Sequence, residues 1–189
     1  WVKRPLHERA AILMKFVSLV ERDKDKLAKL LSDETGKPIT EAYGEIGNVS
    51  IGIPAFCEKA KHEYGNMIPA GQENGNENTL QYTVQAPLGV VVAIIPFNFL
   101  SDLFCQKIPA ALLMGNSVIM KPSPHNPLTL TKYAELLLEA GVDEGAINVI
   151  NGTGGMAAQA LAANPGVSLV SLTGATKSGI ETMKTCSQN

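Results

Sequence analysis

The spacing of hydrophobic residues changes near Gly89 and divides the chain into a helical part and a mixed part. Before that point, apolar side chains recur every three or four residues, which predicts an amphipathic helix over residues 6–31 and a second helix after Thr40. We expect Gly36-Lys37-Pro38 to end the first helix and Thr40 to cap the second. The expected inner face of the second helix consists of Tyr43, Ile46, Ile51, Ala55 and Phe56.

A polar segment separates these helices from the rest of the chain. Residues 71–78 are rich in glycine and asparagine, which is typical of a loop. Residues 79–86 then alternate in the pattern of a half-exposed strand. We expect this strand to form one side of a β-hairpin arm outside the main core.

Beyond Gly89, short apolar runs alternate with helical patterns. Strands that are apolar on both faces and joined by helices indicate a parallel sheet covered on both sides. The predicted strands are residues 90–95, 117–120, 147–150 and 167–172, and the predicted helices are residues 103–114, 128–140, 156–163 and 176–185. The predicted fold class is therefore α/β: an open parallel sheet with flanking helices, an N-terminal helical segment and a protruding β-hairpin arm.

Composition and charge exclude several classes of protein. The chain has 189 residues, of which 45% are hydrophobic and 18% charged, as is ordinary for a globular enzyme domain. Because the net charge is −2 and no apolar run has the length of a membrane span, we expect neither a nucleic-acid partner nor a membrane association. The three cysteines lack metal-ligand spacing, so no metal site is predicted. Their odd number, without a secretory signal, favours a reducing, cytoplasmic location.

Candidate chemistry lies where the predicted strands end, because ligands of open parallel sheets bind at the carboxyl ends of the strands. The first strand is followed by Pro96, Phe97 and Asn98. The side-chain amide of Asn98 offers two N–H groups that could stabilise a developing oxyanion. The alternative, that Asn98 only forms a turn beside a core phenylalanine, also fits these residue types.

The second strand is followed by Lys121, Pro122 and Ser123, without the acid that holds the ribose in a common dinucleotide fold. A lysine and a serine suit a phosphate, such as the 2′-phosphate of NADP. The alternative is a solvated lysine in a proline-rich turn.

The loops after the third and fourth strands are rich in glycine. Gly152, Gly154 and Ala157 match the pattern G-x-G-x-x-A of pyrophosphate loops, between a predicted strand and a predicted helix. No acid follows at the expected distance, so a plain glycine turn remains an alternative. Gly174 allows a ligand to approach the backbone at the start of the last helix, although this pattern alone is too loose to name a cofactor.

In their order along the chain, these four loops resemble the motifs of the aldehyde dehydrogenase family. Residues 87–99 contain Pro-Phe-Asn after an apolar strand, and residues 111–123 resemble the segment ALxxGNxVxxKPS. Residues 145–152 resemble GxxNVxxG, and residues 170–179 resemble FTGSTxxG. The similarity extends over essentially the whole chain.

The resemblance implies a role for each loop. Asn98 would donate to the oxyanion of a thiohemiacetal, and Lys121 would hold the adenosine ribose. Pro124 replaces the family's usual glutamate and does not repel a phosphate, so the implied cofactor is NADP or NAD rather than strictly NAD. The residues implied to form the cofactor site are Ile94, Ile95, Pro96, Phe97, Asn98, Lys121, Ser123, Pro124, Gly152, Thr173, Gly174, Ala175 and Gly179.

The resemblance also implies a domain organisation. Residues 1–66 would be N-terminal helices that pack on the cofactor domain, residues 67–88 a loop and an oligomerisation arm, and residues 89–189 a Rossmann-like NAD(P)-binding domain. The family's catalytic domain and its nucleophilic cysteine are absent from these residues, and both ends of the chain resemble cut ends. We therefore expect a fragment, inactive alone, of a homo-oligomer that is a dimer or a tetramer.

The implied function is that of an oxidoreductase that converts an aldehyde to a carboxylic acid with NAD(P)+ through a cysteine thiohemiacetal. Two alternatives stay open: an acylating aldehyde dehydrogenase or acyl-phosphate reductase, in which another acceptor replaces water, and a non-catalytic dinucleotide-binding fragment. Leu103, Phe104 and Gln106 are expected to form a moderately apolar entrance for the aldehyde, which the sequence does not identify further.

Overall fold

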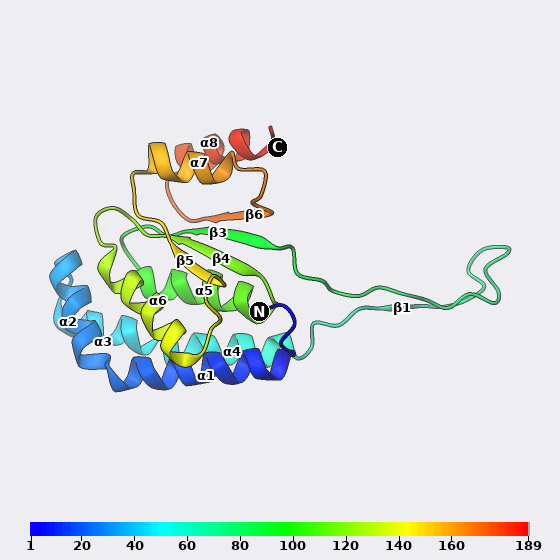
Figure 1. Cartoon of the computed structure of the whole chain (residues 1–189), viewed down its shortest axis with the longest axis horizontal. Helices are drawn as coiled ribbons and strands as arrows, with labels where there is room; N and C mark the ends of the chain where they lie inside the picture. Colours follow the sequence, from blue (N-terminus) through cyan, green and yellow to red (C-terminus); the bar gives the residue numbers. More distant parts are fainter. Residues whose placement is uncertain (189) are drawn as a thin grey trace.

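A four-stranded parallel sheet lies at the centre of the molecule (Figure 1), as the alternating apolar runs predicted. The computed structural model describes residues 1–188. The strands lie in the order β5-β4-β3-β6, so the chain runs outward from β3 to β5 and then crosses to the other side of β3. The strand order therefore reverses between β3 and β6, which is where open parallel sheets bind ligands. The strands are β3 (Val90–Ile94), β4 (Ser117–Lys121), β5 (Ile147–Val149) and β6 (Leu169–Leu172).

Helices flank this sheet (Figure 1). α5 (Leu100–Leu113) and α6 (Leu128–Ala140) lie between the sheet and the N-terminal helices, whereas α7 (Gln159–Ala162) and α8 (Thr176–Cys186) lie beyond β6 on the opposite side of the molecule. The helix predicted over residues 156–163 is shorter than expected, because its first three residues belong to a π-helical turn, η1 (Gly154–Ala158), which begins with two glycines. No helix within residues 1–188 is long and apolar enough to cross a membrane.

The N-terminal helices form an outer layer against α5 and α6. The single helix predicted over residues 6–31 is wrong, because the chain breaks at Asp23 into α1 (Leu6–Arg22) and α2 (Lys24–Thr35). The break allows α1 to pack along α6 while α2 packs mainly on the helix that follows it. Gly36 ends α2 in the left-handed conformation, with φ of 71°, which confirms the predicted stop.

The second predicted helix is also divided, into α3 (Ile39–Gly47) and α4 (Val49–Ala60). Thr40 does not cap it, because α3 already begins one residue earlier. The predicted inner face is largely wrong, since Tyr43 and Ile51 are exposed. The buried positions recur three or four residues apart and include small side chains; they are Ala42, Ile46, Val49, Ile53, Cys57 and Ala60.

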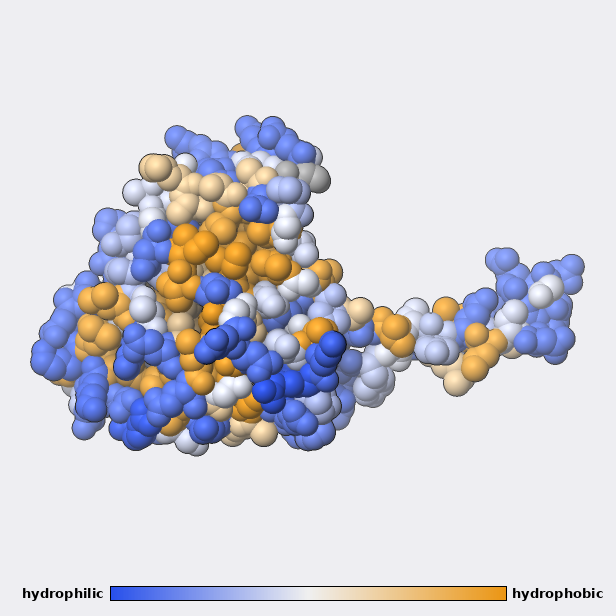
Figure 2. All heavy atoms as spheres, in the orientation of Figure 1, coloured by the Kyte–Doolittle hydropathy of each residue, from blue (hydrophilic) through white to orange (hydrophobic). Residues whose placement is uncertain are grey.

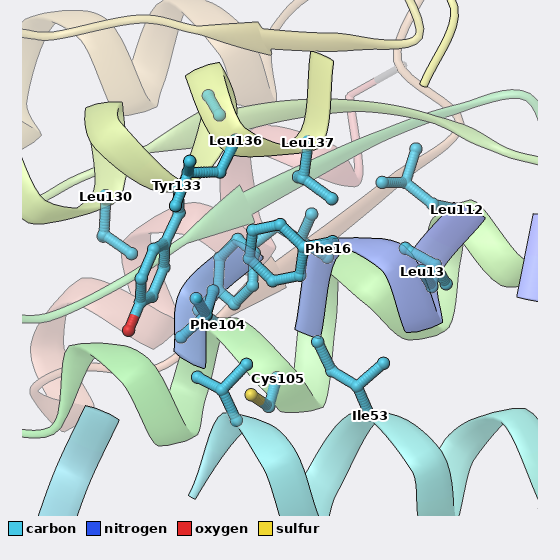
Figure 3. Close-up of a cluster of buried hydrophobic side chains, with 14 of the residues drawn as sticks. Leu13, Phe16, Ile53, Phe104, Cys105, Leu112, Leu130, Tyr133, Leu136 and Leu137 are labelled. Atoms are coloured by element: carbon cyan, nitrogen blue, oxygen red, sulfur yellow. The ribbon is translucent and has the colours of Figure 1, made fainter. Parts of the chain in front are cut away.

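One hydrophobic core joins the N-terminal helices to the helices on the sheet (Figure 3). Phe16 of α1, Phe104 of α5 and Tyr133 of α6 are fully buried, and their ring centroids lie 5.7, 5.8 and 4.8 Å apart. The Tyr133 hydroxyl forms a hydrogen bond of 2.9 Å with the Ser101 hydroxyl, which gives both buried polar groups a partner. This cluster fixes α1, α5 and α6 relative to one another.

A long arm protrudes from the body (Figure 1). β1 (Met67–Ile68) and β2 (Gln81–Tyr82) pair antiparallel, so the predicted hairpin is present with strands of only two residues. The tip of the arm is hydrophilic, while its stem carries apolar residues (Figure 2). Leu80 and Val84 of the stem are 74% and 72% exposed, so the arm presents apolar side chains away from the core.

Candidate cofactor and active site

The carboxyl ends of three strands meet at one edge of the sheet. Ile94 of β3 lies opposite both Lys121 of β4 and Leu172 of β6. A cavity of about 280 Å³ opens beside these residues, with walls from the loops after the three strands, from η1 and from α8. The reversal of strand order therefore coincides with a cavity, as in other open parallel sheets.

The cavity brings together most of the residues that were predicted from the strand ends. These residues are Ile94, Ile95, Pro96, Lys121, Ser123, Pro124, Thr173 and Gly174. The other predicted residues, which lie outside its lining, are Phe97, Asn98, Gly152, Ala175 and Gly179. The residues up to Pro96 therefore line this cavity, whereas Phe97 and Asn98, which follow Pro96, line a different hollow.

Lys121 places a positive charge in the cavity wall. The residue is only 2% exposed, and its Nζ donates a hydrogen bond of 2.8 Å to the carbonyl oxygen of Pro122. Burial lowers the pKa of this ammonium below the usual value of a lysine. Since an ammonium has three N–H groups, the bond to Pro122 leaves donors for a ligand. The site therefore suits a phosphate or a ribose hydroxyl.

The helices contribute lining residues that the strand-end analysis missed. Beside Gly154, which belongs to the predicted G-x-G-x-x-A pattern, these are Gly155, Ala158, Gln159, Ser178, Glu181 and Thr182. Glu181 and Thr182 follow Ser178 by three and four residues on α8, which is the spacing of one helical face and a signal that the sequence contained. Thr185 donates a hydrogen bond of 2.6 Å to the side chain of Gln159, so α7 and α8 are joined beside the cavity.

Gly152 has a packing role next to the cavity. A Cβ atom at this position would lie 2.8 Å from the Cβ of Ala157, closer than two such atoms can approach. The glycine therefore lets the loop after β5 pack tightly on η1. Of the G-x-G-x-x-A pattern, Gly152 and Ala157 therefore form a close loop-to-helix contact, and Gly154 lines the cavity.

Asn98 lines a second hollow, of about 320 Å³. One side of this hollow is formed by residues 34–38 and Glu41 of the N-terminal layer, and the other by Phe97, Asn98 and residues 125–126. The Asn98 side chain is exposed and makes no hydrogen bond within residues 1–188. Both of its amide N–H groups are therefore free to donate to a ligand.

The two buried cysteines are poor candidates for a nucleophile. Burial raises the pKa of Cys105 to about 12 and also raises the pKa of Cys57. Both thiols are therefore protonated at neutral pH, whereas the thiolate is the reactive form. Within residues 1–188, no group of three or more histidine, cysteine, aspartate and glutamate side chains is placed to hold a metal ion.

Phe104 and Lys107 of α5 hold this helix against neighbouring elements. Phe104 is fully buried against Phe16 and Tyr133, so its predicted place at a substrate entrance is wrong: its face of the helix turns toward α1 and α6. Lys107 donates a hydrogen bond of 2.9 Å to the hydroxyl of Ser171, and burial lowers the pKa of the lysine. This bond ties α5 to β6.

A larger hollow, of about 560 Å³, lies between β6, α7 and α8. Its lining is mainly apolar and includes Val167, Leu169, Val170 and Met183. Ligand sites combine an apolar wall with convergent polar groups. The smaller cavity has these groups, so we regard it as the candidate cofactor site.

Comparison with known proteins identifies the family. The sequence model of the aldehyde dehydrogenase family matches residues 1–189, and the chain belongs to this family. It is 36% identical over 173 residues to the 3-sulfolactaldehyde dehydrogenase of Priestia aryabhattai, a match that covers 92% of this chain and 36% of the relative. It is 35% identical over 189 residues to the succinate-semialdehyde dehydrogenase (NADP+) of Escherichia coli K12, a match that covers 100% of this chain and 38% of the relative.

A solved structure agrees with this assignment. The NADP-dependent glyceraldehyde-3-phosphate dehydrogenase from Bacillus halodurans C-125, complexed with NADP, matches with a TM-score of 0.93 and 33% identity. The match covers 98% of this chain and 39% of that structure. The likeness confirms the predicted Rossmann-like architecture. The chain spans between 36% and 39% of the length of these three relatives.

Proposed function

We propose that this chain is the cofactor-binding portion of an enzyme that oxidises an aldehyde to a carboxylic acid with NADP or NAD. The observation that carries the proposal is the cavity at the reversal of strand order. The buried Lys121, the turn of Thr173 and Gly174, and the end of β3 converge there. Residues from separate family motifs therefore meet in one place, although they are far apart in the sequence.

The lining of the cavity fits the adenosine part of a dinucleotide. Lys121 and Ser123 would hold the ribose or its 2′-phosphate, and Pro124 contributes no carboxylate that would repel that phosphate. Gly174 and the start of α8, with the adjoining Ala175, would approach the phosphates. The volume of about 280 Å³ lies near the lower end of ligand pockets, about 300–1,000 Å³, so these residues would enclose part of the cofactor. The bound cofactor supplies the acceptor of the hydride.

Asn98 would act on the aldehyde rather than on the adenosine. A cysteine thiolate from outside the 189 residues would attack the carbonyl carbon, and the carbonyl oxygen would gain negative charge in the resulting thiohemiacetal. The free amide N–H groups of Asn98 would donate to this oxygen and stabilise it. Once the thiohemiacetal carbon had lost its hydride, water would hydrolyse the resulting acyl thioester, release the acid and restore the cysteine. An enzyme that used another acyl acceptor would need the same contribution from Asn98.

The relatives guide the choice of substrate class. Their names specify 3-sulfolactaldehyde and succinate semialdehyde as substrates. Both compounds are small aliphatic aldehydes that carry an acidic group, and we extend to the whole protein only the small aliphatic aldehyde. We propose that residues outside these 189 contribute to the selection among such aldehydes.

We also propose that the whole protein is a homo-oligomer located in the cytoplasm. An isolated two-stranded ribbon is marginally stable in water, and the arm exposes apolar stem residues such as Leu80 and Val84. Packing of the arm on a second copy would bury them. The cytoplasmic location rests on the cysteine usage of the sequence.

The proposal is tested by calorimetric titration of the folded chain with NADP and with NAD. We expect both cofactors to bind, and Lys121→Ala to weaken NADP by about 10- to 100-fold, because hydrogen bonds to charged groups contribute about 1.5–3 kcal/mol. The loss for NAD is expected to be several-fold smaller, since NAD lacks the 2′-phosphate.

Lys132→Ala is the matched control, because Lys132 lies on α6 and pairs with Glu135 on the surface. It should leave both affinities unchanged. Equal losses of NADP and NAD binding in Lys121→Ala would remove the phosphate contact from the proposal. Failure of the folded parent chain to bind either cofactor would remove the site itself.

A further inference from the structure

The segment that carries Asn98 is held in place by a lysine from the N-terminal layer. Lys37 lies just after α2, and its Nζ donates a hydrogen bond of 3.1 Å to the carbonyl oxygen of Asn98. The same ammonium lies 4.3 Å from the centre of the Phe99 ring. Within residues 1–188, the bond from Lys37 is the one hydrogen bond that Asn98 makes. Lys37 therefore fixes the peptide group next to the exposed Asn98 side chain.

Glu45 of α3 completes this contact. Its side chain is 3% exposed; one carboxylate oxygen pairs with Lys37, and the other accepts a hydrogen bond of 2.9 Å from the backbone N–H of Ser101. Ser101 lies in the first turn of α5, where the N–H groups have no partner within the helix. The carboxylate thus holds the start of α5 and orients the lysine that holds Asn98.

Asn126 holds the other side of the same segment. This residue is 2% exposed, and its amide nitrogen donates a hydrogen bond of 2.7 Å to the carbonyl oxygen of Phe97. The backbone of the segment is therefore bound at three positions, Phe97, Asn98 and Ser101, by side chains from distant parts of the chain. Such contacts restrict an exposed loop to one backbone conformation.

We propose that Lys37 and Glu45 are positioning residues that fix the direction in which the Asn98 amide points. The inference rests on the proposed oxyanion role of Asn98. An oxyanion donor acts only when its N–H groups are aimed at the site of developing charge, and an error of about 1 Å can cost about a hundredfold in rate. A buried ion pair is weak evidence for stability alone, and here both partners also bind the backbone around Asn98.

The experiment compares Lys37→Met, Asn98→Ala and the variant with both changes in the whole protein. We expect Lys37→Met to lower kcat for the aldehyde by about 10- to 100-fold, with the Kd of NADP changed by less than about twofold. In the Asn98→Ala background, the same change should lower kcat by less than about twofold, because Lys37 acts through Asn98. Lys37→Arg should restore at least half of the lost activity, since arginine keeps the positive charge and an N–H donor.

Two further variants separate positioning from folding. Lys29→Met removes the exposed Lys29–Asp33 pair of α2 and should leave kcat unchanged. Lys37→Met leaves the Glu45 carboxylate buried without its partner, so Lys37→Met with Glu45→Gln is made as well. The amide introduced by Glu45→Gln keeps an oxygen that can accept from the Ser101 N–H, and the protein should fold with the low kcat of Lys37→Met.

The possible outcomes distinguish this inference from the proposed function. If Asn98→Ala lowers kcat and Lys37→Met lowers it by the same factor with or without Asn98, the positioning inference is wrong. A folded Lys37→Met, Glu45→Gln variant with normal kcat would overturn it equally. If Asn98→Ala alone leaves kcat unchanged, the failure belongs to the proposed oxyanion role.

Discussion

Replacement of Asn98 by alanine in the whole protein is expected to lower kcat for the aldehyde by about 10²–10³-fold, a loss of about 3–4 kcal/mol in transition-state stabilisation. The physical reason is that an alanine has no N–H group to donate to the thiohemiacetal oxygen. The expected fall is in kcat rather than in cofactor affinity, because Asn98 lies outside the lining of the cavity that contains Lys121. Steady-state kinetics at saturating cofactor would measure it.

Asn98→Asp and Asn78→Ala sharpen this test. Aspartate has nearly the size of asparagine but carries a negative charge and no N–H donor, so Asn98→Asp should be at least as slow as Asn98→Ala. Asn78 is an exposed asparagine near the tip of the arm, and its replacement should leave kcat unchanged. An unaltered kcat in both Asn98 variants, with NADP still bound, would show that charge on the carbonyl oxygen is stabilised by other groups.

The strands of the sheet could be predicted because their signal is local. The central strand β3 is an apolar run flanked by turn residues, and a strand that is buried on both faces needs this composition wherever it stands in the fold. α6 begins and ends at the predicted residues, Leu128 and Ala140, because Pro127 precedes it and Gly141 follows it in the left-handed conformation. Such signals depend on neighbours in the sequence rather than on tertiary contacts.

The faces and breaks of the N-terminal helices could not be predicted in the same way. The sequence predicts Tyr43 and Ile51 on the inner face, whereas the structure buries Ala42 and Cys57. Apolar residues on several sides of a helix allow more than one buried face, and the helices that pack against it decide which face is buried. The break at Asp23 has the same origin, because α1 packs mainly on α6 and α4, whereas α2 packs mainly on α3.

The lining of the candidate cofactor cavity could be predicted where loops after strands form it, but not where helices form it. Lys121 and Gly174 follow strands, and strand ends converge in any open parallel sheet. The spacing of Glu181 within α8 marks one face of a helix, but the tertiary placement of α7 and α8 decides that Gln159 and this face line the cavity. Phe104 was misassigned for a related reason: it follows the Asn98 loop closely in sequence, but its position in the helix turns it toward the core.

Phe104→Ala is expected to lower the free energy of unfolding by about 3–5 kcal/mol, the usual cost of removing a buried phenylalanine. Phe104 is fully buried, and its ring centroid lies 5.7 Å from that of Phe16 and 4.8 Å from that of Tyr133. Three helices meet at these rings, so they have little freedom to move inward and fill the space that the substitution leaves. Urea unfolding followed by circular dichroism would measure the loss.

Phe97→Ala is the matched control, because Phe97 is the same residue type in a neighbouring part of the chain but is 60% exposed. Its replacement should change the free energy of unfolding by no more than about 0.5 kcal/mol, as is usual at the surface. Similar losses in the two variants would mean that Phe104 is not part of the rigid aromatic cluster. The contrast matters for function, because α5 begins two residues after Asn98 and its fifth residue, Phe104, packs it against α1 and α6. A loose α5 would also loosen the segment that Lys37 and Glu45 hold.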